Sequence, residues 1–185
     1  MINEINIQIE KMCNMFKNNQ YLFLTEGDIH CYLYKLLSET DMVSNLKKSK
    51  DNRFTTPLHS EVSFFGENNK LSNRVDVAVV DVSTMDLYSI DSTSEDRRSK
   101  GYEFDEANVA IELKLNKNGG KEKVIKELNK DLQKLKRLKI GNPNVTFISI
   151  FFDKRNRLNQ IDLANIKNKY PMIKVYYQGI DEKNN

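Results

Sequence analysis

The chain has 185 residues, of which 39% are hydrophobic and 30% charged, a size and composition typical of one domain with a substantial core and a well-solvated surface. Its apolar stretches fall far below the roughly 18 residues that a membrane-spanning helix needs, which excludes that class of protein. The N-terminus has no basic stretch followed by an apolar run, so no secretory signal is expected. Two cysteines, Cys13 and Cys31, are too few for a disulfide framework or a cysteine-based zinc site, which favours the cytoplasm.

The net charge of +3 conceals an uneven distribution. Ten basic and three acidic residues lie between Lys114 and Lys139, whereas the polar stretch 83–106 holds seven acidic and three basic residues and is predicted to be an insertion. A concentrated basic segment suits a polyanionic partner, because Lys and Arg beside phosphates release condensed counterions. A solvated helix face is the alternative.

The first part of the chain is predicted to be helical. Apolar residues recur at helical spacing over 3–18, which predicts a helix within an N-terminal segment 1–20. Thr25 followed by Asp28 has the form of a capping box and predicts the start of a second helix. Residues 41–56 are polar and are predicted to form a loop.

The middle of the chain changes to the alternating pattern of strands. The predicted strands cover 59–65, 74–82 and 109–115. Residues 66–70 are predicted to join the first two as a hairpin loop. A short further strand is expected near Leu87–Ile90.

The last third is predicted to hold, in order, a long helix, a strand, a short helix and a final strand, over 121–139, 145–152, 158–169 and 173–177. The continuous apolar run of 145–152 is typical of a strand buried on both faces, and residues 178–185 are expected to be a tail. The order of elements predicts an α/β sandwich with a mixed sheet, in one domain over 1–185.

Three charged residues interrupt the apolar strands. Glu112 and Lys114 are two apart in one strand and therefore share a face, and Asp76 lies between Val75 and Val77 in the strand before it. Burying such charges is costly unless they are paired or used. If the strands are neighbours, Asp76 and Glu112 converge, and a hard divalent cation, most often Mg²⁺, relieves their repulsion. A buried structural ion pair is the alternative.

Asp76, followed by Ile111-Glu112-Leu113-Lys114 in a helix–strand–strand–strand–helix–strand order, resembles the PD-(D/E)XK nuclease superfamily over residues 22–152. The resemblance implies a restriction endonuclease-like αβββαβ core with a mixed central sheet flanked by helices, to which the C-terminal helix and strand are added. It implies that Asp76 and Glu112 bind Mg²⁺, for which Mn²⁺ can substitute, and that Lys114 is the catalytic lysine. Glu26 matches a metal-proximal acid of the first core helix, and Gln133 matches a supporting polar residue of the helix after the signature strand.

Two interpretations stay open for several residues. Glu26 serves either the site or the start of its helix, where an acid suits the macrodipole. Glu61 is either a further site carboxylate or a solvent-facing residue. Lys117, Lys121 and Lys123 either contact phosphates or form a solvated turn.

The remaining polar candidates have simpler interpretations. His30 and His59 are too few and too separated for a zinc site and are predicted to be structural. Arg97, Arg98 and Lys100 lie in the insertion, where a disordered loop is expected rather than a nucleic-acid contact.

The expected function is therefore that of a metal-dependent nuclease acting on DNA. Mg²⁺ held by Asp76, Glu112 and Glu26 would bind the scissile phosphate, and water positioned by Lys114 would attack in line. Family analogy implies a 5′-phosphate product. The alternatives are a nucleic-acid- or protein-binding module of the same fold without cleavage, and RNA as substrate, which the absence of a Lys/Arg-Gly-Phe motif disfavours. Double-strand cleavage would favour a symmetric homodimer.

Overall fold

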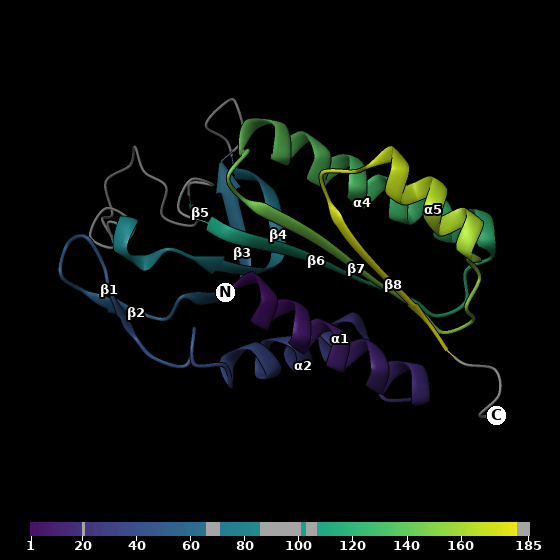
Figure 1. Ribbon diagram of the computed structural model, residues 1–185, viewed down its shortest axis with the longest axis horizontal. Coiled ribbons are helices and arrows are strands. Elements are labelled where there is room, and N and C mark those ends of the chain that lie inside the picture. Colours follow the sequence, from purple (N-terminus) through teal and green to yellow (C-terminus); the bar gives the residue numbers. More distant parts are fainter. Residues whose placement is uncertain (20, 66–70, 86–100, 103–106, 181–185) are drawn as a thin grey trace.

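One mixed sheet lies between two layers of helices (Figure 1). The computed structural model describes residues 1–19, 21–65, 71–85, 101–102 and 107–180. The strand order in the sheet is β5 (Gly101–Tyr102), β3 (Leu58–Phe65), β4 (Leu71–Val80), β6 (Ala107–Asn116), β7 (Thr146–Asp153) and β8 (Lys174–Gly179). β4 runs antiparallel to both β3 and β6, whereas β7 is parallel to β6 and β8 is parallel to β7. The prediction of a mixed α/β architecture is confirmed.

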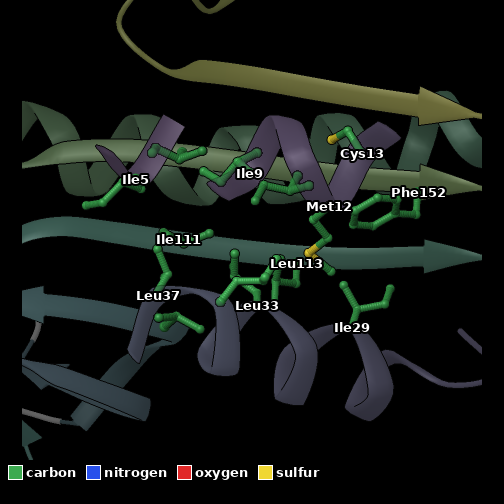
Figure 2. Close-up of a cluster of buried hydrophobic side chains, with 14 of the residues drawn as sticks. Ile5, Ile9, Met12, Cys13, Ile29, Leu33, Leu37, Ile111, Leu113 and Phe152 are labelled. Atoms are coloured by element: carbon green, nitrogen blue, oxygen red, sulfur yellow. The ribbon is translucent and has the colours of Figure 1, made fainter. Parts of the chain in front are cut away.

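Helices cover both faces of this sheet (Figure 1). α1 (Ile2–Asn18) and α2 (Glu26–Ser38) lie on one face, and α4 (Lys121–Gly141) and α5 (Gln160–Lys169) lie on the other. Each face buries its own apolar cluster. Figure 2 shows the cluster under α1 and α2, in which Ile9, Met12 and Leu33 pack towards Ile111 and Leu113 of β6.

The strand β6 separates the two clusters by simple alternation. Ile111, Leu113 and Leu115 belong to the cluster under α1 and α2, whereas Ala110 belongs to the cluster under α4. Because side chains alternate along a strand, Glu112 is directed towards α4. The strand β7 is buried on both faces, because all of its residues after Thr146 are buried, as its continuous apolar run predicts.

The start of α2 is fixed by the predicted capping box. The Thr25 hydroxyl accepts the Asp28 N–H at 3.1 Å, and the Asp28 carboxylate accepts the Thr25 N–H at 2.8 Å. Such caps contribute about 1 kcal/mol. Glu26 is therefore the first helical residue, and it contacts Lys114 and Leu115 near the C-terminal end of β6.

Two predictions about local structure are wrong. Residues 41–56 are not only a loop, because β1 (Lys47–Lys48) pairs with β2 (Phe54–Thr55), and the Ser49 hydroxyl closes the turn onto the main chain of Arg53. This ladder is too short and polar to show an alternating pattern. The strand predicted over 74–82 ends at Val80, because Asp81 accepts the Ser83 N–H and caps a 3₁₀ turn, η1 (Val82–Thr84).

The predicted insertion and tail are described only in part. Within 83–106, the structure describes the end of η1, Met85 and β5, which pairs with β3. The predicted tail begins inside β8, which runs to Gly179. The expected hairpin loop 66–70, the short strand at Leu87–Ile90 and the basic residues Arg97, Arg98 and Lys100 lie outside the described residues. In the described part of the chain, no helix has both the length and the apolar character required to cross a membrane.

Candidate active site

The antiparallel ladder between β4 and β6 stops where the charged residues begin. Its last pair on this side is Val77 with Ile111, and the next residues along the two strands are Asp76 and Glu112. The Leu113 N–H donates to Asp76 Oδ2 at 2.6 Å, so a carboxylate replaces the expected backbone acceptor. The structure thus brings Asp76 beside the strand segment that carries Glu112 and Lys114.

Glu112 is held by Lys134, a lysine of α4 that the sequence analysis did not single out. Lys134 Nζ lies 2.9 Å from Glu112 Oε1 and 2.8 Å from Oε2, and it also donates to the main-chain oxygen of Arg74. Only 15% of the Glu112 side chain is exposed. Burial raises the pKa of Glu112 to about 7. The effect of burial is therefore larger than the opposing effect of the Lys134 ammonium, which lowers this pKa. The neighbouring Asp76 charge acts in the same direction as burial.

Asp76 also resists ionisation. Burial raises its pKa, and the Glu61 charge adds to this, whereas the Leu113 N–H and the charges of Lys134 and His30 oppose it. Asp76 and Glu112 are therefore two adjacent carboxyl groups whose charged forms are poorly solvated. A hard cation would stabilise both charged forms at once.

Lys114 pairs with Glu26, across the gap between β6 and the start of α2. Lys114 Nζ lies 2.9 Å from Glu26 Oε1, and the same oxygen accepts the Leu115 N–H at 3.4 Å. Burial lowers the pKa of Lys114, but the hydrogen bond and charge of Glu26 outweigh it, so the pKa lies above its usual value. The Glu26 side chain is 49% exposed, so it lies at the surface of the site rather than in the interior.

α4 presents an acid and a lysine to the site, one helical turn apart. Asp131 and Lys134 flank the buried stripe that includes Leu128, Leu132 and Leu135. Burial raises the pKa of Asp131, while the charges of Lys114 and Lys134 oppose that rise. Gln133 is exposed on the same helix. The signal that could have found the pair is an acid and a lysine three residues apart, bordering an apolar stripe directly after the signature strand.

Glu61 marks an irregularity in β3 beside Asp76. The ladder pairs Ser60 with Val77 and Val62 with Val75, so Glu61 falls opposite Asp76. Its φ is +56°, in the left-handed region that non-glycine residues rarely adopt. Its exposed carboxylate pairs with Arg74 at 2.7 Å. Local strain of this kind concentrates at functional sites.

The two histidines lie in different surroundings. His59, on β3, is half-buried, and burial lowers its pKa. His30 lies one turn after Glu26 on α2 and is near enough to Asp76 for its charge to lower that pKa. Its Nε2 is buried, with no hydrogen-bond partner among the described residues. The structure thus places His30, which the sequence analysis treated as structural, near the site.

A surface pocket of about 710 Å³ extends from Glu26 and Lys114 to the start of α4, and its lining does not include Asp76 or Glu112. Its lining includes Glu26, Lys114, Lys117 and Lys123. Of the three lysines for which a phosphate contact and a solvated turn are both open, Lys117 and Lys123 therefore line this pocket. Lys121 instead pairs with Asp162 of α5 at 2.7 Å, so its charge is engaged elsewhere.

The donor set of the site suits Mg²⁺ or Mn²⁺, because carboxylate oxygens are the ligands that hard cations prefer. Within the described ranges, however, no three His, Cys, Asp or Glu side chains are gathered into a group that could hold a metal ion. Two of the candidate ligands are engaged by lysines, Glu112 by Lys134 and Glu26 by Lys114. The carboxylate oxygens of the site thus suit a divalent ion. In this structure the positive charge beside Glu112 and Glu26 comes from Lys134 and Lys114.

Comparisons with known proteins identify no relative of this chain. No protein-family model matches the chain, and neither a curated protein nor a solved structure matches it. The candidate site is defined by the adjacent carboxyl groups of β4 and β6, the lysine two residues further along β6, and the pocket beside them.

Proposed function

We propose that the chain is a metal-dependent nuclease of the PD-(D/E)XK type that hydrolyses phosphodiester bonds, with DNA as the expected substrate. The observation that carries the proposal is the pair of half-buried carboxyl groups, Asp76 and Glu112, at the point where β4 and β6 separate, with Lys114 two residues further. The order α2-β3-β4-β6-α4-β7 supports the restriction endonuclease-like core that the resemblance implies.

The pocket supports a polyanionic substrate. Lys117 and Lys123 line it together with Lys114, so a nucleic-acid backbone bound there would meet several ammonium groups. Ammonium groups beside phosphates release counterions and contribute affinity without sequence preference.

In the proposed reaction, Asp76 and Glu112 would hold the metal. Glu26 is paired with Lys114 in this structure, and Lys114 would leave Glu26 when substrate binds. A bound Mg²⁺ would supply Lewis acidity and lower the pKa of water. The Lys114 ammonium, released from Glu26, would donate a hydrogen bond to the attacking water and offset the charge that develops on the phosphoryl oxygens. Water would form the new P–O bond and lose a proton to solvent, while the bond to the 3′ oxygen breaks and that oxygen takes up a proton from solvent, which leaves a 5′-phosphate and a 3′-hydroxyl.

A binding module without cleavage is the second candidate, and one observation favours it. Glu112 and Glu26 are both paired with lysines, and an ion pair can stabilise these carboxylates without a metal. In that case the pocket lysines would bind nucleic acid and the charged residues of β6 would be structural.

The deciding experiment incubates the purified protein with supercoiled and linear DNA in the presence of Mg²⁺, Mn²⁺ or EDTA. We expect cleavage with either metal, none in EDTA, and a loss of at least about 100-fold in Lys114→Ala. Lys126→Ala, which removes an exposed lysine of α4, is the matched control and should cleave normally. Cleavage that persists in EDTA or in Lys114→Ala would contradict the proposal. Salt-sensitive binding without any cleavage would favour the binding module.

A further inference from the structure

Lys134 makes an unusually complete set of contacts for a lysine on a helix rich in exposed lysines. Its Nζ lies 2.8–2.9 Å from both carboxylate oxygens of Glu112 and also donates to the Arg74 main-chain oxygen. An ammonium has three N–H donors, so these three acceptors use all of them. The Lys134 side chain is 27% exposed, which makes it less accessible to solvent than Lys114 at 34%.

The Lys134 charge also lies among the other carboxyl groups of the site. It lowers the pKa of Asp76, of Glu112 and of Asp131, so all three carboxylates are within its electrostatic reach. A cation that bridges both oxygens of one carboxylate, with two more carboxylates nearby, occupies the kind of place that a divalent ion takes between hard oxygen ligands.

We propose that Lys134 is an internal counter-cation, and that a divalent ion binds Glu112 only by displacing the Lys134 ammonium. This inference rests on the proposed function, because it concerns the same metal site. It goes further by assigning a lysine outside the acid-x-Lys signature as the group that limits metal affinity.

The displaced ammonium has an acceptor within its own helix. Asp131 lies three residues earlier on α4, the spacing at which side chains of a helix meet, and its charge is already coupled to that of Lys134. Lys134 can therefore leave Glu112 without an unpaired charge remaining at the site. In the metal-free form the Lys134 ammonium opposes the repulsion between Glu112 and Asp76.

The test is a measurement of Mn²⁺ binding to the full chain without nucleic acid, by isothermal titration calorimetry and by electron paramagnetic resonance of free Mn²⁺. If Lys134 holds Glu112 in about 90% of molecules, Lys134→Met should bind Mn²⁺ about tenfold more tightly than the wild type. Lys134→Arg keeps the charge and should bind no more tightly than the wild type. Lys130→Met removes an exposed lysine of the same helix and should change the affinity less than twofold.

Unchanged or weaker Mn²⁺ binding by Lys134→Met would overturn the proposal, as would an equal gain in Lys130→Met, which would indicate a general charge effect. If Lys134→Met does not fold, the wild type provides a second readout, because Mg²⁺ should shift the NMR signal of the Lys134 ammonium towards that of a free lysine. An ammonium signal that is unaffected while Mg²⁺ binds would equally overturn it.

The same variants separate this inference from the proposed function. Metal-dependent cleavage by the wild type without tighter binding in Lys134→Met would reject the counter-cation and keep the nuclease. Tighter Mn²⁺ binding in Lys134→Met without DNA cleavage by any variant would keep the counter-cation and reject the nuclease. No Mn²⁺ binding by any variant would reject both.

Discussion

Two carboxylates on neighbouring strands of the sheet, Asp153 and Glu112, are stabilised in different ways. Asp153, at the end of β7, is fully buried and accepts hydrogen bonds from Asn116 Nδ2, the Arg157 N–H and the Tyr177 hydroxyl, each at 2.7 Å. Glu112, on the neighbouring strand, accepts instead from one long lysine side chain. Asp153 is thus held by donors from three separate segments, whereas Glu112 depends on a single side chain.

This difference separates a structural carboxylate from a candidate reactive one. Several donors from separate segments hold the Asp153 side chain in one place. At Glu112, burial raises the pKa to about 7 despite the ammonium, which leaves a group that gains from a further cation. Perturbed carboxyl groups of this kind are concentrated at functional sites.

The largest expected effect comes from removing the charge at the candidate reactive carboxylate. Glu112→Gln should reduce metal-dependent DNA cleavage by at least about 100-fold, because a neutral amide is a poor ligand for a hard cation. Single-turnover cleavage at saturating Mg²⁺ measures this loss, and circular dichroism checks that the variant is folded. Cleavage within tenfold of the wild type would remove Glu112 from the mechanism.

The opposite result is expected at the structural carboxylate. Asp153→Asn should lower the free energy of unfolding by about 2–3 kcal/mol, because an amide nitrogen would face donors that need an acceptor. Urea denaturation measures the loss, with exposed Asp41→Asn as the control. Cleavage per folded molecule should stay unchanged, and a selective loss of cleavage would show that the two carboxylates are not functionally distinct.

A pair of neighbouring lysines tests the pocket. Lys123 lines it, whereas Lys121 is paired with Asp162. Lys123→Ala should therefore weaken DNA binding for all sequences and reduce the slope of log affinity against log salt by about one, while Lys121→Ala should leave the slope unchanged. Fluorescence anisotropy at several salt concentrations measures both. Equal effects of the two substitutions would place the nucleic acid outside the pocket.

The smallest expected effect concerns Tyr177, the hydroxyl donor to Asp153. Burial and the hydrogen bond to Asp153 raise the pKa of Tyr177 above its usual 10.0. A raised pKa favours the protonated form in the folded state, so this contribution is complete below pH 10 and is lost as the pH rises through the folded value. Tyr177→Phe should cost about 1 kcal/mol at pH 7, and its difference from the wild type should shrink above pH 10. Chemical denaturation from pH 7 to above pH 10 measures the difference in unfolding free energy between the two proteins. A difference that stays constant over this range would contradict the prediction.

The fold was largely predictable because its signals are local. Alternating spacing of apolar residues located the longer strands of the sheet, and helical spacing located the helices on its two faces. The Thr25–Asp28 capping box located the start of α2. The β1–β2 ladder escaped prediction because it is held by side-chain hydrogen bonds of Ser49 rather than by an apolar pattern.

The candidate site was predictable only where a charge interrupts an apolar strand. Asp76, Glu112 and Lys114 stand out for that reason, and the structure brings Asp76 and Glu112 to adjacent positions. Lys134 stands out less, because α4 is rich in lysines and only its place three residues after Asp131, beside the apolar stripe, distinguishes it from the others. The roles of Asp153 and Asn116 depend on side chains from three separate elements, which no local pattern reveals.

A crystal structure of the protein soaked in Mn²⁺, with the ion located by its anomalous scattering, tests the proposed metal site directly. We expect a peak within roughly 2.0–2.6 Å of carboxylate oxygens from both Asp76 and Glu112, with Lys134 Nζ moved away from Glu112. A map without such a peak, in which Lys134 still bridges both oxygens of Glu112 at saturating Mn²⁺, would contradict the proposed metal site.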